Sequence, residues 1–408
     1  MAATLDAGDM AWMLVSSAMV MIMTPGLGFF YAGLARNKNV VSTIFQCFST
    51  VALISLVWVL WGYSLAFGPD RFGFIGGLEW FGLNGVGPEP NTEYAASISH
   101  TAFATFQLMF AVITPALIAG AFAERVKFGA FMLFVALWST LVYSPVAHWV
   151  WGAGGWLRSI GALDFAGGTV VHISSGVSAL AAAYLLGRRL GYGNSSFEPS
   201  NPAYVMLGAA ILWFGWFGFN AGSALASNGL ASIAFINTHA AASAGALSWM
   251  LANYYVRGKF SSIATASGAV AGLVAVTPAA GFVRPQSAVL IGLVAGVICF
   301  MAVNFRSKTG LDDSLDVWGV HGVGGTWGSI ATGIFAELSV NPYGADGLVA
   351  GNPSLLTAQV LGVAATWAYA GAVTFLLVKA LDVFIGMRVP VHDEMVGLDI
   401  SQHAEYVT

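Results

Sequence analysis

Charged residues are scarce in this 408-residue sequence: only 8% are Asp, Glu, Lys or Arg, against about 25% in ordinary soluble domains. Hydrophobic residues make up 57% of the chain. A chain of this kind cannot cover a water-facing surface, which excludes a soluble enzyme, a nucleic-acid-binding protein and a disordered protein. Both cysteines, Cys47 and Cys299, lie inside apolar stretches, so no disulfide framework is expected. The composition predicts an integral protein of a lipid bilayer.

Long apolar runs are abundant. A membrane-spanning helix needs about 20 mostly apolar residues, and charged residues and Gly, Pro and Asn clusters divide the chain into eleven such runs. The strands of a β-barrel would be shorter and would alternate apolar with polar residues. We therefore predict an all-α bundle of eleven transmembrane helices. The predicted spans are 10–33, 41–67, 100–123, 128–149, 168–187, 203–222, 230–256, 262–281, 286–305, 318–336 and 354–384.

The few basic residues indicate the orientation of the chain. With the N-terminus outside and the C-terminus inside, twelve of the fifteen Lys and Arg residues fall on the cytoplasmic side, which agrees with the positive-inside rule. The outer side keeps only Arg71, Arg158 and Arg284. The inner set is Arg36, Lys38, Arg125, Lys127, Arg188, Arg189, Arg257, Lys259, Arg306, Lys308, Lys379 and Arg388.

Short sequence matches recur five spans apart and in the same order. Because five is odd, two halves related in this way would have opposite topology, as in the inverted repeats of transporters whose pathway lies at the repeat interface. The predicted division of the single domain is a first repeat at 10–187, a second at 203–338, an eleventh span at 354–384 and a tail at 385–408. The matches are Gly28–Gly33 with Gly218–Gly222, Thr114–Ala116 with Thr277–Ala279, and Leu163-Asp164 before His172 with Leu315-Asp316 before His321.

Two histidines, His172 and His321, occupy corresponding positions inside spans five and ten. An ionisable residue within a span is costly and is a functional candidate by default. A pair of buried, neutral core histidines is the alternative, but equivalent positions in both halves favour convergence at the central axis. His239 in span seven has no counterpart and is interpreted as structural.

Asp164 lies where span five begins and could bind an ion or cap the helix. A carboxylate at a helix N-terminus accepts backbone N–H groups and complements the helix dipole, so we favour the structural role. Asp316 is expected to cap span ten in the same way. Asp312 and Asp313, in the preceding loop, are expected to be solvated.

The spans also lack most of the usual ion-binding chemistry. No Lys or Arg lies deep in a span to attract an anion, no segment resembles a selectivity filter, and two histidines alone lack the further ligands that a metal site needs. No nucleophile–base pair or phosphate-binding loop stands out, so neither an enzyme nor a cofactor is expected. What remains is a narrow apolar route past imidazoles, with aromatic residues near its mouth that form either an interfacial belt or a cation–π cage. These aromatic residues are Trp151, Phe106, Phe110 and Phe219.

Over nearly its whole length the sequence resembles the ammonium transporter family (the Amt/Mep/Rh proteins), and its microbial Amt branch more than its Rh branch. The stretches that carry the resemblance are Pro25–Gly33, Ala147–Gly152, Gly161–His172, Trp216–Ser223, Leu315–Gly322 and Gly397–Asp399.

The resemblance implies a homotrimer in the cell membrane, each subunit with its own pore for ammonium or ammonia. It implies an outer recruitment site of Trp151, Phe106 and Ser223 above a gate of Phe110 and Phe219. The twin pore histidines would be His172 and His321, with Thr277 and Asp164 as structural support. It also implies that the tail docks under a neighbouring subunit, and that a cytoplasmic PII-type nitrogen-regulatory protein is a partner.

Three functions are compatible with these residues. The favoured one is electrogenic uptake, in which NH4+ is recruited, deprotonated, and conducted as NH3 together with its proton. An ammonium sensor with little flux is the second, although the chain shows no fused signalling domain. A channel for another neutral gas such as CO2 is the third, but a neutral gas needs no cation site.

Overall fold

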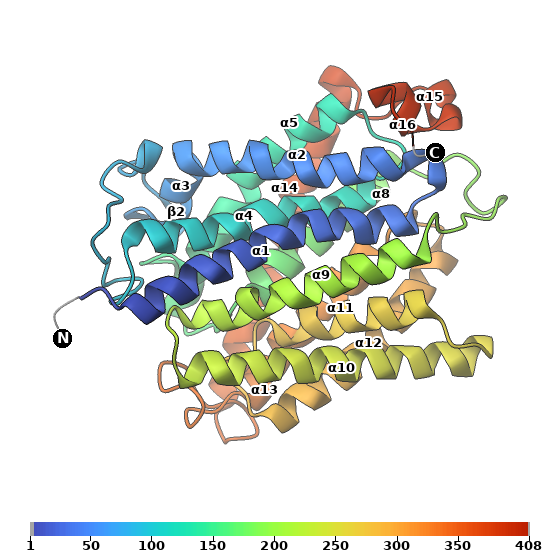
Figure 1. Cartoon of the computed structure of the whole chain (residues 1–408). Helices are drawn as coiled ribbons and strands as arrows, with labels where there is room; N and C mark the ends of the chain where they lie inside the picture. Colours follow the sequence, from blue (N-terminus) through green and yellow to red (C-terminus); the bar gives the residue numbers. More distant parts are fainter. Residues whose placement is uncertain (1–3, 407–408) are drawn as a thin grey trace.

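The computed structural model describes residues 4–406 as a bundle of helices with one short β-hairpin (Figure 1). Antiparallel strands β1 (Asp70–Arg71) and β2 (Ile75–Gly76) form the hairpin. The α-helices are α1 (Ala7–Leu34), α2 (Val40–Val57), α3 (Tyr63–Phe67), α4 (His100–Phe122), α5 (Phe128–Trp138), α6 (Ser144–Trp151), α7 (Trp156–Ser159), α8 (Ser174–Leu186), α9 (Pro202–Ala221), α10 (Gly229–Arg257), α11 (Ser262–Val276), α12 (Pro285–Thr309), α13 (Val323–Phe335), α14 (Pro353–Ile385), α15 (Val391–Val396) and α16 (Leu398–His403). The short 3-10 and π segments are η1 (Asn37–Asn39), η2 (Trp58–Gly62), η3 (Phe81–Leu83), η4 (Ser139–Tyr143), η5 (Gly168–Ile173), η6 (Gly222–Ala224) and η7 (Trp318–Gly322).

Within residues 4–406, nine helical stretches are long and apolar enough to cross a membrane, and each coincides closely with a predicted span except that the fourth extends beyond its predicted end. They are Ala7–Leu34, Asn37–Phe67, His100–Phe122, Phe128–Ser159, Gly168–Leu186, Pro202–Ala224, Gly229–Arg257, Pro285–Thr309 and Pro353–Ile385. The other two predicted spans correspond to shorter helices, α11 and the continuous pair η7–α13. The predicted end of the eighth span at residue 281 is wrong, because α11 stops at Val276 and Pro278 has no N–H to continue a helix.

The helices run between two ends of the bundle. Helix α1 begins at the end that also holds the β-hairpin, whereas α15 and α16 lie at the opposite end (Figure 1). This opposite end holds Arg36, Arg125, Arg189, Arg306 and Arg388, and we call it the arginine-rich end.

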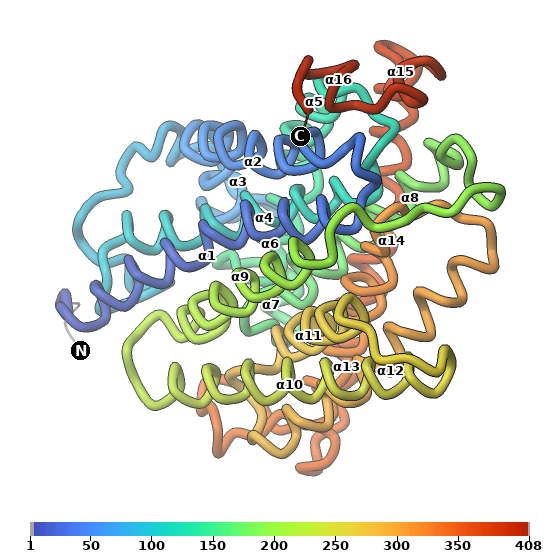
Figure 2. Tube along the Cα trace, turned by 45° about the vertical axis from the view of Figure 1, so that its right-hand side comes forward, coloured from blue at the N-terminus to red at the C-terminus, as the bar shows by residue number. Residues whose placement is uncertain are grey.

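Glycine allows the first helices of the two predicted halves, α1 and α9, to lie side by side (Figure 2). A β-carbon at Gly208 would collide with the backbone of Phe30, and one at Gly33 would lie 2.7 Å from the backbone of Asn201 and of Val205. Small residues permit close packing where lipid provides no hydrophobic driving force between helices. The abundance of glycine thus explains the tight contact between these distant segments.

The arginine-rich end contains a buried ion cluster, which corrects the prediction that Asp312 and Asp313 are solvated. Asp312 is 1% exposed and Asp313 is fully buried. Asp312 accepts from Arg125 Nη1 at 2.8 Å and from Arg189 Nη2 at 2.9 Å. Burial raises the pKa of Asp312, but the hydrogen bond and charge of Arg189 more than offset this and hold that pKa below its usual value. Sequence patterning missed the cluster because its members come from three separate loops.

The tail that follows α14 packs against this end of its own chain. Lys38 Nζ donates to the carbonyl oxygens of Glu394 and Met395 at 2.7 and 2.6 Å. Asp399 accepts from the backbone N–H groups of Val41 and Ser42 at 3.1 and 2.7 Å, where α2 begins. The tail therefore caps the start of α2 in its own chain.

Breaking the buried cluster should destabilise the fold. Arg125→Met leaves Asp312 short of a buried partner, and removing one member of a buried ion pair costs about 3–5 kcal/mol. We expect a clearly lower thermal unfolding temperature for the detergent-solubilised protein. Arg71→Met, which breaks an exposed pair with Glu79, is the matched control and should cost less than about 1 kcal/mol. Equal unfolding temperatures for the two variants would contradict the proposed role of the cluster.

Candidate functional site

His172 and His321 meet in the interior of the bundle. Their Nδ1 atoms are 3.2 Å apart and their side chains are almost completely buried, at 1% and 3% exposure. A hydrogen bond between two Nδ1 atoms requires that one carries a proton and the other does not. The pair therefore shares one proton at its centre, while the two Nε2 atoms face away from the contact.

The sequence brings these rings together through glycine and a local widening of each helix. Both histidines lie in π segments, η5 and η7, which are rare and are frequent at functional sites. A β-carbon at Gly176 would collide with the backbone of Gly322, and one at Gly325 would lie 2.9 Å from the β-carbon of His172. Only glycine allows the two segments to approach this closely.

A stack of aromatic rings continues from the histidines toward the end of the bundle where α1 begins. Trp216 and Phe219 lie nearly parallel to His172, with centroids 5.5 and 6.1 Å away. Phe219 in turn contacts Phe110 at 4.3 Å between centroids. Thr277 Oγ1 accepts from Trp216 Nε1 at 2.8 Å. Thr277 therefore supports this ring beside the histidines and does not line the mouth of the pathway.

A narrow cavity surrounds the histidines. It offers about 20 Å³ to the centres of water-sized molecules, enough for about one water. Its wall is largely apolar, and its polar members are Tyr31, Trp216, His172, His321 and Asp316. His172 Nε2 is buried and has no hydrogen-bond partner within residues 4–406, so the cavity contains a polar atom available to a small guest.

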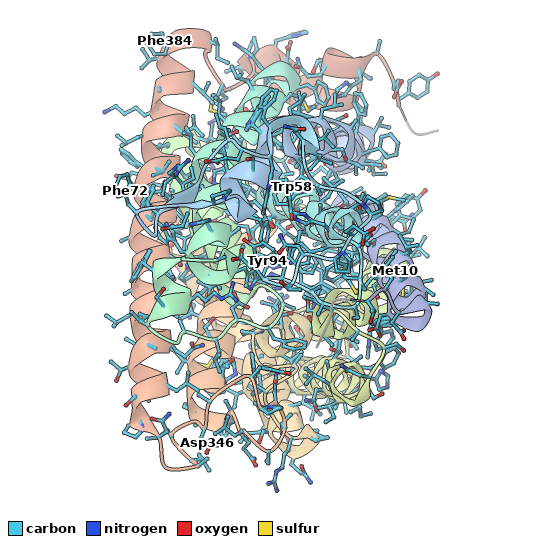
Figure 3. All side chains as sticks on the ribbon, turned by 90° about the vertical axis from the view of Figure 1, so that its left-hand side faces the viewer. Met10, Trp58, Phe72, Tyr94, Asp346 and Phe384 are labelled. Carbon is cyan, nitrogen blue, oxygen red and sulfur yellow. The ribbon has the colours of Figure 1, made fainter. Side chains whose placement is uncertain are left out.

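A second, wide cavity of about 420 Å³ lies at the end of the bundle opposite the arginine-rich end. Phe110, Trp151 and Ser223 line it, together with Tyr94 and Gln107. Figure 3 shows Tyr94 near the middle of this end of the molecule. Phe110 belongs to the wide cavity and Phe219 to the narrow one, so the contact between these two rings separates the cavities.

Phe106 was predicted to belong to the recruitment set with Trp151 and Ser223. It is fully buried and is not among the residues that line the wide cavity. Its ring contacts Phe110 at 4.9 Å between centroids, and a β-carbon at Gly222 would lie 2.8 Å from it. Phe106 therefore packs against Phe110 and close to Gly222.

The carboxylate of Asp164 is saturated by backbone donors. Oδ1 accepts from Gly167 and Gly168 at 2.7 Å each, and Oδ2 accepts from Thr169 at 2.7 Å and Val170 at 3.2 Å. These are the free N–H groups at the start of η5, which a cap satisfies. The Asp164 backbone carbonyl also accepts from Trp151 Nε1 at 2.9 Å, so this loop fixes the Trp151 ring at the cavity wall.

Asp316 does not cap span ten, which corrects the expectation from its resemblance to Asp164. The first N–H of η7, that of Trp318, donates instead to Asp313 Oδ2 at 2.8 Å. Asp316 pairs with Arg306 at 2.5 Å. The Leu-Asp pattern was misleading because Asp164 lies four residues before the first residue of η5, Gly168, whereas Asp316 lies only two before that of η7, Trp318.

Sequence reasoning named no role for Trp216, Tyr31 or Asp313. Trp216 belongs to one of the stretches that carry the family resemblance, but its contact with His172 depends on tertiary packing. Tyr31 donates to the carbonyl of Leu117 at 2.9 Å and lines the narrow cavity. His239, interpreted as structural, lies on the exposed face of α10 beside Trp213 and Phe217. Residues 4–406 hold no cluster of His, Cys, Asp and Glu suited to a metal ion.

Comparison with known proteins gives a consistent picture. The model of the Ammonium Transporter Family matches residues 11–408. An ammonium transporter of Bacillus subtilis is 52% identical over 399 residues, covering 98% of both chains. The crystal structure of Candida albicans Mep2 superposes with a TM-score of 0.91 at 38% identity, covering 98% of this chain and 90% of that one. A structure described as a sensor Amt protein has a TM-score of 0.89 at 30% identity, covering 97% and 98%.

The helices, the two cavities and these comparisons agree on one assignment. The chain is a multi-pass protein of the cell membrane that belongs to the ammonium transporter family.

Proposed function

We propose that this protein recruits NH4+ in the wide cavity, removes its proton, and conducts NH3 through the narrow cavity, with the proton passing along the histidine pair. The observation that carries the proposal is the arrangement around Phe110 and Phe219. On one side of these rings lies a wide, polar cavity, and on the other a narrow, apolar one that contains His172 and His321.

Recruitment rests on the face of Trp151, the hydroxyl of Ser223 and the ring of Phe110. Trp gives the strongest cation–π attraction, about 2 kcal/mol when desolvated. Ser223 Oγ donates to the carbonyl of Phe219 at 2.9 Å, which leaves its lone pairs free to accept an N–H. Asp164 has no open lone pair and supports the site from below.

Deprotonation is required because a bare cation cannot enter the narrow cavity. Moving an ammonium-sized ion into a low-dielectric medium costs of order 20 kcal/mol in the idealised limit. Removing the proton from an amine with a pKa of roughly 10.4 costs only about 4–5 kcal/mol at pH 7. K+ has no proton to release, so the same step excludes it.

The histidine pair suits proton transfer because its two Nδ1 atoms share one proton. A proton arriving at one Nε2 lets the shared proton cross and frees a proton at the other Nε2. The proton thus crosses beside the neutral ammonia, which makes uptake electrogenic.

The topology and assembly form part of the proposal. We infer eleven spans arranged as inverted repeats at 10–187 and 203–338, because η5 and η7 place their histidines equivalently. The arginine-rich end then faces the cytoplasm by the positive-inside rule. The resemblance to microbial Amt proteins supports a homotrimer and a PII-type regulator that docks at this end.

Ammonium sensing with little flux is the second candidate, because one similar structure is described as a sensor. The measurement that separates the two is the ammonium-driven current across liposomes that contain the purified protein. Sustained, K+-excluding current supports transport, whereas ammonium binding without current supports sensing. A CO2 channel predicts gas flux without current.

Replacing Trp151 tests the recruitment site. Trp151→Leu removes the cation–π face, which should weaken recruitment by about 1–2 kcal/mol and raise the half-saturating ammonium concentration about tenfold. Trp61→Leu is the matched control, since Trp61 hydrogen-bonds Thr140 and lines neither cavity. Unchanged concentration dependence in the Trp151 variant would refute the site.

Replacing each histidine tests the relay. His172→Leu and His321→Leu should each abolish or sharply reduce the ammonium current, or admit K+ as water fills the gap. The fold should survive, because an apolar side chain replaces a buried polar one and only the partner ring loses a hydrogen bond, at about 1–3 kcal/mol. His239→Leu, on the exposed face of α10, is the control. Wild-type, K+-excluding currents in both pore variants would show that the imidazoles carry no proton.

A further inference from the structure

Gln359, in the second turn of α14, is a buried polar residue beside the wall of the wide cavity. It is only 3% exposed, and it is not among the residues that line the wide or the narrow cavity. Sequence reasoning assigned it no role, because the eleventh span lies outside both predicted repeats. Buried polar groups are as a rule hydrogen-bonded, and the partners of Gln359 show what it holds.

All the polar atoms of the Gln359 amide are engaged. Oε1 accepts from Leu163 N at 2.7 Å, and Nε2 donates to the carbonyl oxygens of Leu163 and Ser329 at 2.8 and 2.9 Å. An amide supplies one acceptor atom and two N–H donors, whereas an ionised carboxylate supplies acceptors only. The three contacts therefore match the chemistry of glutamine in one orientation of its amide.

Leu163 belongs to a loop that has no helix or strand of its own. Helix α7 ends at Ser159, and η5 begins at Gly168, so the shape of the chain between them depends on side-chain contacts. Gln359 binds both the N–H and the carbonyl of Leu163, as an opposing residue does in an antiparallel β-ladder. One side chain of α14 thus fixes the loop at this point.

The fixed loop in turn holds the ring of Trp151. The Leu163 carbonyl lies in the rigid peptide plane that joins it to Asp164, and the Asp164 carbonyl accepts from Trp151 Nε1 at 2.9 Å. Leu163, Asp164 and Trp151 all line the wide cavity. A short path of two hydrogen bonds and the backbone between them therefore leads from α14 to this aromatic ring.

We propose that Gln359 is a positioning residue for the recruitment of ammonium. It holds the Leu163–Asp164 peptide so that Asp164 keeps the Trp151 ring at the wall of the wide cavity. This inference rests on the proposed function, in which Trp151 supplies the cation–π face. Gln359 itself touches no substrate. The eleventh span, which belongs to neither predicted repeat, takes part in ammonium binding through this contact.

A cation–π contact depends on geometry, because the cation must lie over the ring within about 6 Å of its centroid. If only a fraction of the molecules hold the ring in the binding orientation, the apparent dissociation constant rises by the inverse of that fraction. The passage beyond Phe110 and Phe219 does not include Gln359. Loss of Gln359 should therefore raise the half-saturating ammonium concentration and leave the maximal current nearly unchanged.

The test measures ammonium-driven currents of proteoliposomes over a range of ammonium concentrations. Gln359→Met keeps a side chain of similar length but removes both donors and the acceptor. We expect its half-saturating concentration to rise by about three- to tenfold, because the roughly tenfold effect of losing the whole Trp151 ring is the upper limit. Its maximal current should change by less than about twofold.

Thr374→Val is the matched control on the same helix. Thr374 is fully buried, accepts from Trp138 Nε1 at 3.0 Å and donates to Ser178 Oγ at 2.7 Å. This variant also breaks buried hydrogen bonds of α14, but not those to the Leu163 loop. It should lower the unfolding temperature, as Gln359→Met does, and keep the half-saturating concentration of the wild type.

A double-mutant cycle with Trp151 separates positioning from a general loss of packing. If Gln359 acts through the Trp151 ring, Gln359→Met has nothing left to position in the Trp151→Leu background. The double variant should then match Trp151→Leu alone. Multiplied effects in the double variant would overturn the role of Gln359, as would an unchanged half-saturating concentration in Gln359→Met.

The failure of the proposed function has a different signature. A wild type that gives no ammonium current would refute transport itself, and an unchanged concentration dependence in Trp151→Leu would refute the recruitment site. Should Gln359→Met fail to fold, Gln359→Asn takes its place in the same cycle with the same expected outcomes. Its shorter side chain cannot reach Leu163 and Ser329 together.

Discussion

The passage between Phe110 and the arginine-rich end is too narrow and too apolar to keep an ion hydrated, and the rest of the structure depends on this constraint. With about 20 Å³ for water-sized molecules, the narrow cavity cannot hold a hydration shell. A cation would have to lose its water to enter this cavity, at a cost of order 20 kcal/mol in the idealised limit. The wide, more polar cavity lies on one side of Phe110 and Phe219, and the histidine pair lies in the narrow cavity on the other.

Glycine residues make the narrow passage possible. The histidine segments touch only because Gly176, Gly322 and Gly325 carry no side chains, and a narrow route needs its polar groups within one hydrogen bond of each other. The same close approach occurs between α1 and α9, where the two predicted halves meet at Gly208. Small residues let the helices approach closely, and the contact between Phe110 and Phe219 separates the two cavities.

Much of the fold could be predicted from the sequence because membrane spans obey simple rules of length and polarity. Nine predicted spans coincide with long apolar helices, and the pairing of His172 with His321 followed from their equivalent positions. The end of α11 was missed because apolar residues continue beyond Pro278, so hydropathy alone does not register the turn. Hydropathy also does not reveal π segments, which are set by packing.

The differences between prediction and structure at the site have one physical origin. The partners of side chains near the ends of spans are set by tertiary packing, not by their position in the sequence. Asp312 was expected in water but is buried against Arg125 and Arg189. Phe106 was expected to line the recruitment site, but its ring is fully buried against Phe110 and near Gly222. Spacing along the chain predicts which residues approach the pathway, but not which of them reach its surface.

Asp164 and Asp316 show the same limit, because these two residues at similar positions in the sequence have different hydrogen-bond partners. Both residues follow a leucine and precede a pore histidine. The carboxylate of Asp164, however, accepts hydrogen bonds from four backbone N–H groups. The second shares one oxygen with Arg306 and leaves the other open. If the halves are inverted repeats, these two acids lie at opposite mouths of one pathway. Asp164 therefore fixes the start of η5 and, through its carbonyl, the ring of Trp151, whereas Asp316 pairs with Arg306 at the arginine-rich end. Similar positions in the sequence thus do not give the two carboxylates the same role, because the groups that each one contacts come from different parts of the fold.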